Sequence, residues 1–269
     1  MKYGPAIEQI DELFGNSAFG HFILFNALNV LLPRSWHLRR ELKIWQKKTS
    51  NGHQHILDSG SGLGQYSYML SGINKSWSVH GIDISGKLVG HCNKVFRKLR
   101  KENVLFKVGD LTEAITKNSY DLVLGMDIAE YVTEDEQMFR NFHESLRDGG
   151  ALLMYVHLID EKNPRRKRAR MKLVEEQVRN GYTSKGIKEK LKNGGFSRVK
   201  IRYVFGFAGY VSWHLSVLYP LAMVNVSFLS FILLPIYYLI LLPVILVLNY
   251  IETRTGHLTG SAMFVKAFK

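Results

Sequence analysis

The sequence predicts an α/β protein built on a doubly wound, seven-stranded and mostly parallel sheet. Short apolar runs that read as strands alternate with helical segments along most of the chain. The first of these strands leads into a glycine-rich turn, and the second ends in an acidic residue. With 269 residues and 46% hydrophobic composition, the chain can bury one such core and still supply further elements.

The glycine-rich turn is the segment around which this fold is organised. Residues 55–64 read His-Ile-Leu-Asp-Ser-Gly-Ser-Gly-Leu-Gly. Glycines allow positive φ and a close ligand approach, and the following helix presents unpaired N–H groups, so the turn indicates a nucleotide-type site. Dinucleotide enzymes favour G-x-G-x-x-G, whereas here Asp58 precedes G-x-G-x-G. A turn that only packs a helix on the sheet is the alternative.

This pattern resembles motif I of the Rossmann-like, class I methyltransferases that use S-adenosylmethionine (SAM). The resemblance implies that SAM is the cofactor and that its methionine part faces Asp58, Gly60, Ser61, Gly62 and Gly64. A Gly-Gly turn before the fifth strand and a Gly-Tyr-Thr, helix, Gly-Phe, strand order near residues 181–205 extend the resemblance. It covers most of residues 53–210 and 258–269.

Two further acids follow predicted strands. Asp83 near the end of Ser78–Ser85 lies 19 residues after Gly64, where a doubly wound fold places a carboxylate for the ribose hydroxyls. The resemblance assigns Asp110, after the strand Val104–Asp110, to the adenine amino group; a helix N-cap is the alternative reading. The predicted cofactor set also includes Ile84, Leu111 and Asp127.

The predicted reacting groups follow the fourth and fifth strands. The run Tyr120–Asp127 is nearly all apolar, as a central parallel strand requires, and ligands bind at the carboxyl ends of such strands. We therefore expect Asp127, Tyr131 and His157 to be catalytic, with Glu130 and Tyr182 nearby. His157 has the best intrinsic pKa for a base, although a structural histidine is the alternative. Relatives often have Glu-His where this chain has Glu130-Tyr131.

Charge and cysteine content limit the partners and the compartment. The net charge of +13 suits an anionic partner, either a membrane surface or nucleic acid. Seven of the eleven residues 162–172 are Lys or Arg, which indicates a solvated segment or contact with phosphates and anionic headgroups. The single cysteine, Cys92, predicts a buried thiol, a reducing compartment and no cysteine-rich metal site; we expect no metal.

The remaining segments are a helical N-terminal region and a long apolar insertion. Residues 1–52 read as a helical lid, a lipid contact or a plain packed helix, with an end or kink at Pro33. Residues 203–251 contain no Asp, Glu, Lys or Arg. We expect an insertion, 211–257, whose three prolines divide it into short helices that form an in-plane or re-entrant hairpin rather than two spans; a homodimer interface is the alternative.

The sequence therefore predicts three parts, with a SAM-binding domain (53–210 and 258–269) between the lid (1–52) and the insertion (211–257). The expected function is a SAM-dependent methyltransferase on the cytoplasmic face of a membrane with anionic lipids, acting on a lipid-like or other hydrophobic acceptor. An RNA methyltransferase using residues 162–172 and a non-catalytic SAM-binding membrane protein are the alternatives. Nucleic acid is not the expected partner, because it leaves the apolar run unexplained.

Overall fold

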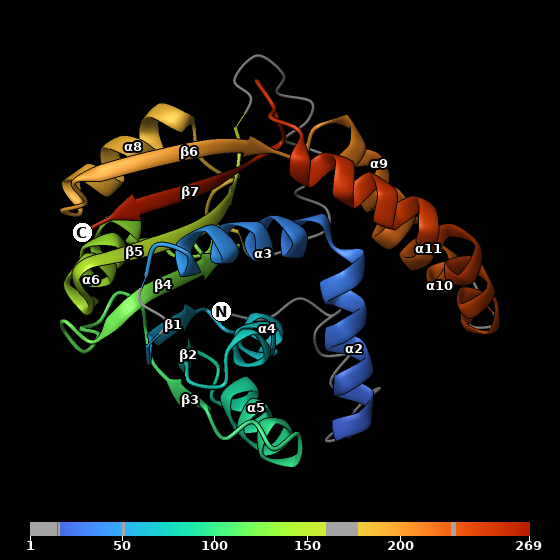
Figure 1. The fold of residues 1–269 in the computed structure, drawn as a ribbon, viewed down its shortest axis with the longest axis horizontal. Coiled ribbons are helices and arrows are strands. Elements are labelled where there is room, and N and C mark those ends of the chain that lie inside the picture. Colours follow the sequence, from blue (N-terminus) through green and yellow to red (C-terminus); the bar gives the residue numbers. More distant parts are fainter. Residues whose placement is uncertain (1–14, 16, 50–51, 160–176, 227–229) are drawn as a thin grey trace. The chain divides into compact units, whose positions relative to one another are not determined.

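The computed structural model describes residues 15, 17–49, 52–159, 177–226 and 230–269. A seven-stranded sheet has the order β3-β2-β1-β4-β5-β7-β6, as Figure 1 shows. β1 pairs parallel with β2 and β4, β2 with β3, and β4 with β5. The strands are β1 (His55–Ser59), β2 (Ser78–Asp83), β3 (Val104–Val108), β4 (Tyr120–Met126), β5 (Leu146–His157), β6 (Arg198–Val204) and β7 (Ala262–Phe268).

The last strand inserts between β5 and β6. The Phe268 carbonyl at the end of β7 accepts from the N–H of Ser197, just before β6, at 3.0 Å. The N–H of Lys269 donates to the Gly150 carbonyl, early in β5, at 3.1 Å. Because the end of β7 meets the beginnings of both neighbours, β7 runs antiparallel to them. The predicted doubly wound, mostly parallel sheet is confirmed.

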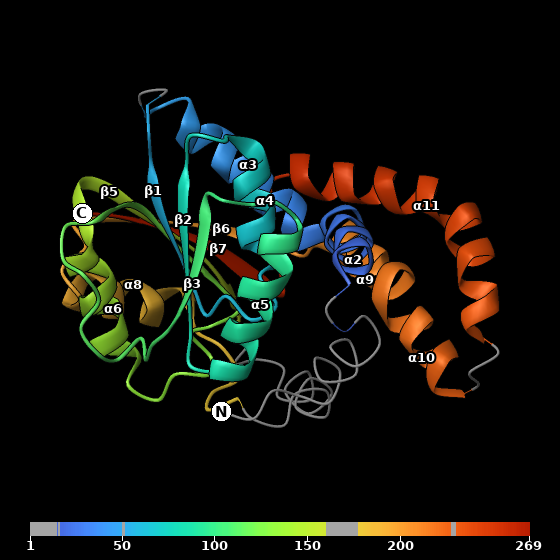
Figure 2. The ribbon, with the colours of Figure 1, turned by 90° about the horizontal axis from the view of Figure 1, so that it is seen from below.

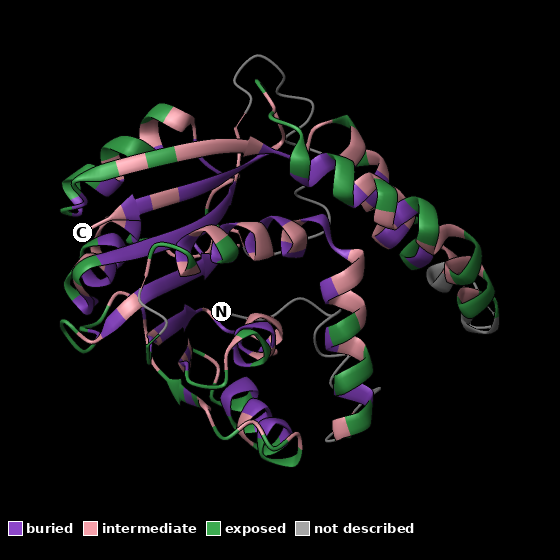
Figure 3. Cartoon of the chain, viewed as in Figure 1, coloured by how far each residue is buried: buried purple, intermediate pink, exposed green. Residues whose placement is uncertain are grey.

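Helices cover both faces of this sheet. In Figure 2, α4 and α5 lie on one side of β1, β2 and β3, and α6 and α8 lie on the other side. β4 and the later part of β5 are almost wholly buried (Figure 3), whereas the edge strand β3 buries only Phe106. Ser85 and Thr183 cap α5 and α8 by accepting from the N–H groups of Leu88 and Gly186. These helices are α4 (Gln65–Ile73), α5 (Gly86–Lys98), α6 (Asp135–Ser145) and α8 (Ser184–Asn193).

The predicted turn at Arg147–Gly150 is wrong, because β5 begins at Leu146, directly after α6. A register shift between Tyr120 and Leu122 marks a bulge there, and Gly149 adopts φ +76°, which a glycine tolerates. The predicted burial of Cys92 is confirmed: the thiol is 1% exposed and donates to the Gly62 carbonyl at 3.3 Å.

The chain divides into two compact units, which differ from the three predicted parts. Unit 1 comprises residues 1–25, 51–201 and 263–269, and unit 2 comprises 26–50 and 202–262. Unit 2 therefore joins the end of the predicted lid to the insertion. The N-terminal helices are α2 (Ala18–Leu31) and α3 (Pro33–Gln46), so the predicted break at Pro33 is confirmed. Residues 1–14 and the basic segment 162–172 lie outside the described residues.

The described residues of the apolar insertion are helical as far as Arg254. α9 (Phe207–Trp213) continues through a π-helix (His214–Leu218) into α10 (Tyr219–Val226), and α11 (Ser230–Arg254) follows. The prediction that prolines divide the run is wrong for Pro235 and Pro243, which lie inside α11. A 25-residue helix retains enough other backbone bonds to continue through them, and α11 bends along its length in Figure 2.

The π-helix and Pro220 leave two carbonyl groups to be satisfied from α11. Pro220 has no N–H to donate to the Ser216 carbonyl, which accepts instead from the hydroxyl of Tyr238 at 2.9 Å. The N–H of Tyr219 goes to His214, and the Leu215 carbonyl accepts from the hydroxyl of Tyr237 at 2.8 Å. These two tyrosines therefore join the two arms of the insertion.

A buried carboxylate joins the two ends of the insertion by hydrogen bonds. Glu252 of α11 is 0% exposed and accepts hydrogen bonds from the N–H groups of Phe205, Gly206 and Gly209 at the start of α9. His37 of α3 and His257 contact the same carboxylate at 3.2 and 3.0 Å. A Cβ at Gly209 would lie 2.8 Å from Cδ of Glu252, so glycine is required there.

One described helix, Leu233–Arg254, is long and apolar enough to cross a membrane by length and composition. Few of its residues are buried, and the ribbon of α11 in Figure 3 is mainly green and pink, for exposed and partly exposed residues. An apolar helix in the core of a soluble protein is mostly buried, whereas this apolar helix is not.

Candidate cofactor and methyl-transfer site

The glycine-rich turn has the backbone conformation that its sequence predicts. Gly60, Gly62 and Gly64 all have positive φ, between +53° and +82°. A Cβ at Gly60 would lie 2.4 Å from Cδ1 of Ile128, and one at Gly64 would lie 2.9 Å from the ring of Phe96. Gly62 differs, because nothing lies within 4 Å of a Cβ placed there. Gly60 and Gly64 are thus required by packing, while Gly62 borders open space.

Most of the turn's own amides are paired within the protein. The N–H groups of Gly60 and Ser61 donate to the Ile82 carbonyl at 2.8 and 3.0 Å, and that of Gly64 donates to the Ser61 carbonyl at 2.8 Å. The N–H of Gly62 donates to Oδ2 of Asp83 at 2.8 Å. In contrast, Oγ of Ser61 is buried and has no hydrogen-bond partner within the described part of the chain. This hydroxyl remains for a ligand, as an orphaned polar group in a site normally does.

The predicted cofactor acids occupy three different environments. Asp58 is buried and accepts from Oγ of Ser67 at 2.7 Å. Burial raises the pKa of Asp58 to about 6, against an ordinary value of 3.8. Asp83 is 2% exposed, and its Oδ1 accepts from the N–H of Ser85 at 2.9 Å while Oδ2 accepts from Gly62. Asp83 therefore ties β2 to the glycine turn.

Asp110 closes a local turn. Its Oδ1 accepts from the N–H and the hydroxyl of Thr112 at 2.8 and 2.7 Å. No described helix begins at this point, so the helix-cap alternative is replaced by a turn cap. Of the two apolar neighbours in the predicted set, Leu111 is buried, whereas Ile84 is 47% exposed. Ile84 thus offers apolar surface beside Asp83, as contact with a flat base requires.

A second polar cluster lies at the carboxyl ends of β4 and β5. Oε1 of Glu130 accepts from the N–H of His157 at 2.6 Å and lies 3.2 Å from Nδ1 of the same residue. Oδ1 of Asp127 lies 3.9 Å from that Nδ1. Asp127 adopts φ +56°, an uncommon conformation for a residue with a side chain, and thereby turns the chain sharply after β4. The structure therefore brings together three of the predicted side chains.

Burial separates the roles within this cluster. Glu130 is 0% exposed, and its Oε2 has no hydrogen-bond partner among the described residues. The side chains of Asp127 and His157 are 21% and 27% exposed. Glu130 can thus orient the imidazole through Nδ1, while the partly exposed ring faces a ligand and can accept a proton.

The two predicted tyrosines adjoin this cluster, one through the chain and one through a backbone hydrogen bond. The hydroxyl of Tyr182 donates to Oδ2 of Asp135 at 2.8 Å and to the Ala129 carbonyl at 2.9 Å. Burial raises the pKa of Tyr182 far above its ordinary range. Tyr182 nevertheless lies beside the cluster, because its N–H donates to the His157 carbonyl at 2.9 Å. Its hydroxyl is held by the buried Asp135. Tyr131 lies in the turn after β4, where its N–H donates to the Ile128 carbonyl at 3.0 Å.

Sequence reasoning missed Arg179, which shapes the loop after β4. Its guanidinium donates to the carbonyls of Ala129, Val132 and Thr133 at 2.6–2.8 Å. The N–H groups of Val178 and Arg179 also donate to the Glu130 carbonyl. Arg179 thus fixes the loop that carries Glu130. Nothing in the sequence distinguishes this arginine from the other basic residues.

The residues present fit a SAM-sized polar ligand. The orphaned hydroxyl of Ser61, the open space at Gly62 and the exposed apolar Ile84 all adjoin the glycine turn or the end of β2. No group of three or more His, Cys, Asp or Glu residues suitable for a metal ion occurs among the described residues. This observation does not test the prediction that the site holds no metal.

Comparison with known proteins identifies a methyltransferase domain, as the sequence predicts. Residues 50–197 match the family described as methyltransferase domain. Phosphoethanolamine N-methyltransferase 2 of Caenorhabditis elegans is 25% identical over 108 residues, which is 39% of this chain and 24% of that protein. Phosphoethanolamine N-methyltransferase 1 of Triticum aestivum is 30% identical over 105 residues, 38% of this chain and 20% of that protein. The match thus spans a quarter or less of these relatives' length.

Solved structures share the fold. The SAM complex of Haemonchus contortus phosphoethanolamine N-methyltransferase 2 superposes with a TM-score of 0.60 at 17% identity, covering 97% of this chain and 60% of that one. A possible histamine N-methyltransferase of Thermotoga maritima superposes with a TM-score of 0.54 at 13% identity, covering 97% and 99%. These likenesses support the Rossmann-like methyltransferase fold that the sequence predicts.

Proposed function

We propose that this protein, which belongs to the methyltransferase-domain family and is a SAM-dependent enzyme, acts on an amine. The proposed acceptor is the amino group of a phosphoethanolamine-type headgroup at a membrane surface. The predictions of family, enzyme class and cofactor are confirmed by the domain match. The identity of the acceptor is the new step. The observation that carries it is the cluster of Asp127, Glu130 and His157 at the carboxyl ends of β4 and β5.

This cluster has the chemistry that an amine acceptor requires. A primary amine is protonated near neutral pH, and it becomes a nucleophile only after it loses that proton. The carboxylates of Asp127 and Glu130 attract an ammonium group, and the imidazole between them accepts the proton. Bound SAM supplies an electrophilic methyl group. The remaining contribution of the protein is to align the amine and exclude water.

The exposed apolar helix favours an acceptor that is part of a lipid. α11 presents a long apolar surface to solvent, which a chain acting on small soluble molecules does not need. The relatives named above are phosphoethanolamine N-methyltransferases, so an aminoethyl phosphate is the chemical group that they share by name. Phosphatidylethanolamine combines this group with a lipid, and it is the acceptor that we propose.

The test is methyl transfer from isotopically labelled SAM to defined acceptors. The full chain is incubated with vesicles containing phosphatidylethanolamine, with soluble phosphoethanolamine, and with vesicles of phosphatidylcholine alone. Mass spectrometry then follows the label into lipid and aqueous fractions. We expect label in monomethylated phosphatidylethanolamine, at a rate well above that with phosphoethanolamine.

Each other result overturns a defined part of the proposal. Faster labelling of phosphoethanolamine removes the lipid acceptor and leaves the amine chemistry. Labelling of added RNA in place of either amine identifies the enzyme as an RNA methyltransferase. SAM binding without transfer to any of these acceptors contradicts methylation of a phosphoethanolamine-type headgroup.

A further inference from the structure

We propose that a basic pocket in unit 2 binds the phosphate of an anionic membrane lipid. This pocket is distinct in its residues from the cofactor and methyl-transfer site, and it does not depend on which acceptor is methylated. It encloses about 510 Å³ between α3 and the end of α11. Its lining residues are Trp36, Arg39, Arg40, Lys43, Ile44, Lys47, Tyr250, Thr253 and Arg254.

The pocket is formed by one face of α3. Its α3 residues recur at the spacing of a helical stripe, from Trp36 through Lys43 to Lys47. The other face of α3 is buried and includes Leu38, Leu42 and Trp45. Three of the five α3 residues that line the pocket are Lys or Arg, Lys47 directly after α3 adds a fourth cation, and Arg254 of α11 adds a fifth.

Among the residues that the structure describes, no acid lines the pocket to balance these charges. The nearest carboxylate on α3 is Glu41, which is 2% exposed and lies 3.3 Å from Nε of Arg202 and 3.8 Å from Arg40. Within the described residues, Arg39, Lys43 and Lys47 have no carboxylate within ion-pair distance. Burial lowers the pKa of Arg39, which reflects a cation held partly out of water. An anion entering the pocket would therefore gain several favourable contacts at once.

The apolar face of α11 identifies the source of that anion. Its exposed residues follow one helical stripe and include Leu233, Ile236, Ile240, Val244, Val247 and Ile251. The pocket residues Tyr250 and Arg254 continue this stripe by one turn, and Arg254 lies over the Tyr250 ring at 5.3 Å. An anionic lipid has the same arrangement, with acyl chains beside a phosphate. A free phosphate or RNA would leave the apolar stripe without a partner.

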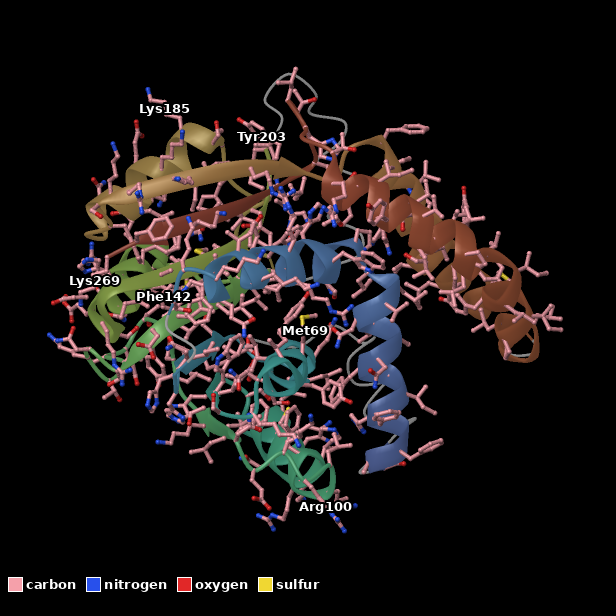
Figure 4. The ribbon with its side chains drawn as sticks, viewed as in Figure 1. Met69, Arg100, Phe142, Lys185, Tyr203 and Lys269 are labelled. Atoms are coloured by element: carbon pink, nitrogen blue, oxygen red, sulfur yellow. The ribbon has the colours of Figure 1, made fainter. Side chains whose placement is uncertain are left out.

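Vesicle flotation with the purified full chain tests this site. Vesicles of phosphatidylcholine are compared with vesicles that also contain phosphatidylglycerol. The variant R39Q/K43Q removes two pocket charges and keeps side chains of similar length. The control K185Q/K188Q removes two charges from α8 in unit 1, where Lys185 is 86% exposed and points away from the fold in Figure 4.

We expect wild-type protein to bind phosphatidylglycerol vesicles at least tenfold better than phosphatidylcholine vesicles. R39Q/K43Q should lose about tenfold of the affinity for phosphatidylglycerol vesicles, and K185Q/K188Q less than twofold. Unchanged SAM affinity and an unchanged melting temperature in both variants show that the fold is intact. The transfer of label to soluble phosphoethanolamine then tests the proposed function separately.

Equal losses of vesicle affinity in the two variants would show that binding depends only on net charge. That result would overturn the proposal that the pocket binds the lipid. Competition by millimolar glycerol phosphate as strong as that by phosphatidylglycerol vesicles would identify a free phosphate site in place of a lipid site. Displacement of vesicles by an RNA oligomer, with binding that depends on Arg39 and Lys43, would assign the pocket to nucleic acid.

Discussion

Two buried glutamates contact a histidine in this protein, and their surroundings differ. In unit 1, Glu130 lies 3.2 Å from Nδ1 of His157, whose side chain is 27% exposed. In unit 2, Glu252 lies 3.2 Å from Nε2 of His37, and both side chains are 0% exposed. Three backbone amides also donate to Glu252, whereas Oε2 of Glu130 has no partner among the described residues.

The difference shows how hydrogen-bond completeness separates a structural pair from a reactive one. Arg202 donates to Nδ1 of His37 at 2.9 Å, so Nε2–H of His37 donates to Glu252 and the imidazole has no capacity left. Every partner of this network lies within unit 2. His157 instead keeps a partly exposed ring beside two carboxylates. We therefore expect substitutions at Glu252 to change stability and substitutions at His157 to change the reaction.

The largest expected effect is on stability, at Glu252. The substitution Glu252→Gln removes the charge that faces Arg202 and that accepts from His37 and three backbone amides in a buried site, where breaking such a network costs about 3–5 kcal/mol. We expect the melting temperature to fall by about 10 °C, measured by differential scanning calorimetry. The control Glu189→Gln changes a glutamate that is 61% exposed, and its effect should be within about 0.5 kcal/mol. A fall of less than 2 °C at Glu252 would contradict a structural role.

Asp83 extends the comparison of buried acids. It is buried like Glu252, but it lies at the carboxyl end of β2, where we expect the cofactor to bind. Asp83→Ala should weaken SAM binding by about 2–4 kcal/mol through the loss of charge-assisted hydrogen bonds to the ribose. Titration calorimetry measures the affinity. Asp121→Asn is the matched control, since this acid begins β4 at the opposite end of the strand and binds Arg147. Unchanged affinity in Asp83→Ala would falsify the ribose assignment.

The next effect is on the methyl-transfer rate, at His157. Removing the base by His157→Ala should lower the rate by about 10²-fold while SAM affinity stays unchanged. Glu130→Gln keeps the shape of the side chain and an acceptor beside Nδ1 but removes the charge, so it should lower the rate less than His157→Ala does. A His157→Ala rate within about threefold of wild type would leave alignment alone as the mechanism.

The elements that local patterns specify could be predicted from the sequence. β1 and β4 end where polar residues replace the apolar runs, and the glycines with positive φ are those that the turn required. Long-range hydrogen bonds explain what the sequence does not reveal. The capping of α9 by Glu252 joins residues 43 or more positions apart. Such partners have no local signature, and the same holds for Arg179.

The smallest effect concerns the pH dependence of SAM binding through Asp58. Burial raises the pKa of Asp58 in the folded protein from 3.8 to about 6. The free energy of unfolding of the protein without ligand should therefore fall as the pH rises from about 4 to 6, by about 3 kcal/mol in total. The resemblance to class I methyltransferases implies that this carboxylate faces the methionine part of SAM, and we propose that it lies near the ammonium group. Binding should then favour the ionised form and release a proton near pH 6.

SAM affinity should therefore weaken by up to tenfold for each pH unit below about 6, since one pKa unit corresponds to 1.36 kcal/mol. Calorimetry at pH 6 in two buffers with different ionisation enthalpies measures the released proton directly. Asp58→Asn keeps a hydrogen-bond acceptor for Ser67 but cannot ionise, so its affinity should be lower at pH 7.5 and flat between pH 5 and 7. An identical pH slope in wild type and Asp58→Asn would show that another group titrates, and it would move the ammonium contact away from Asp58.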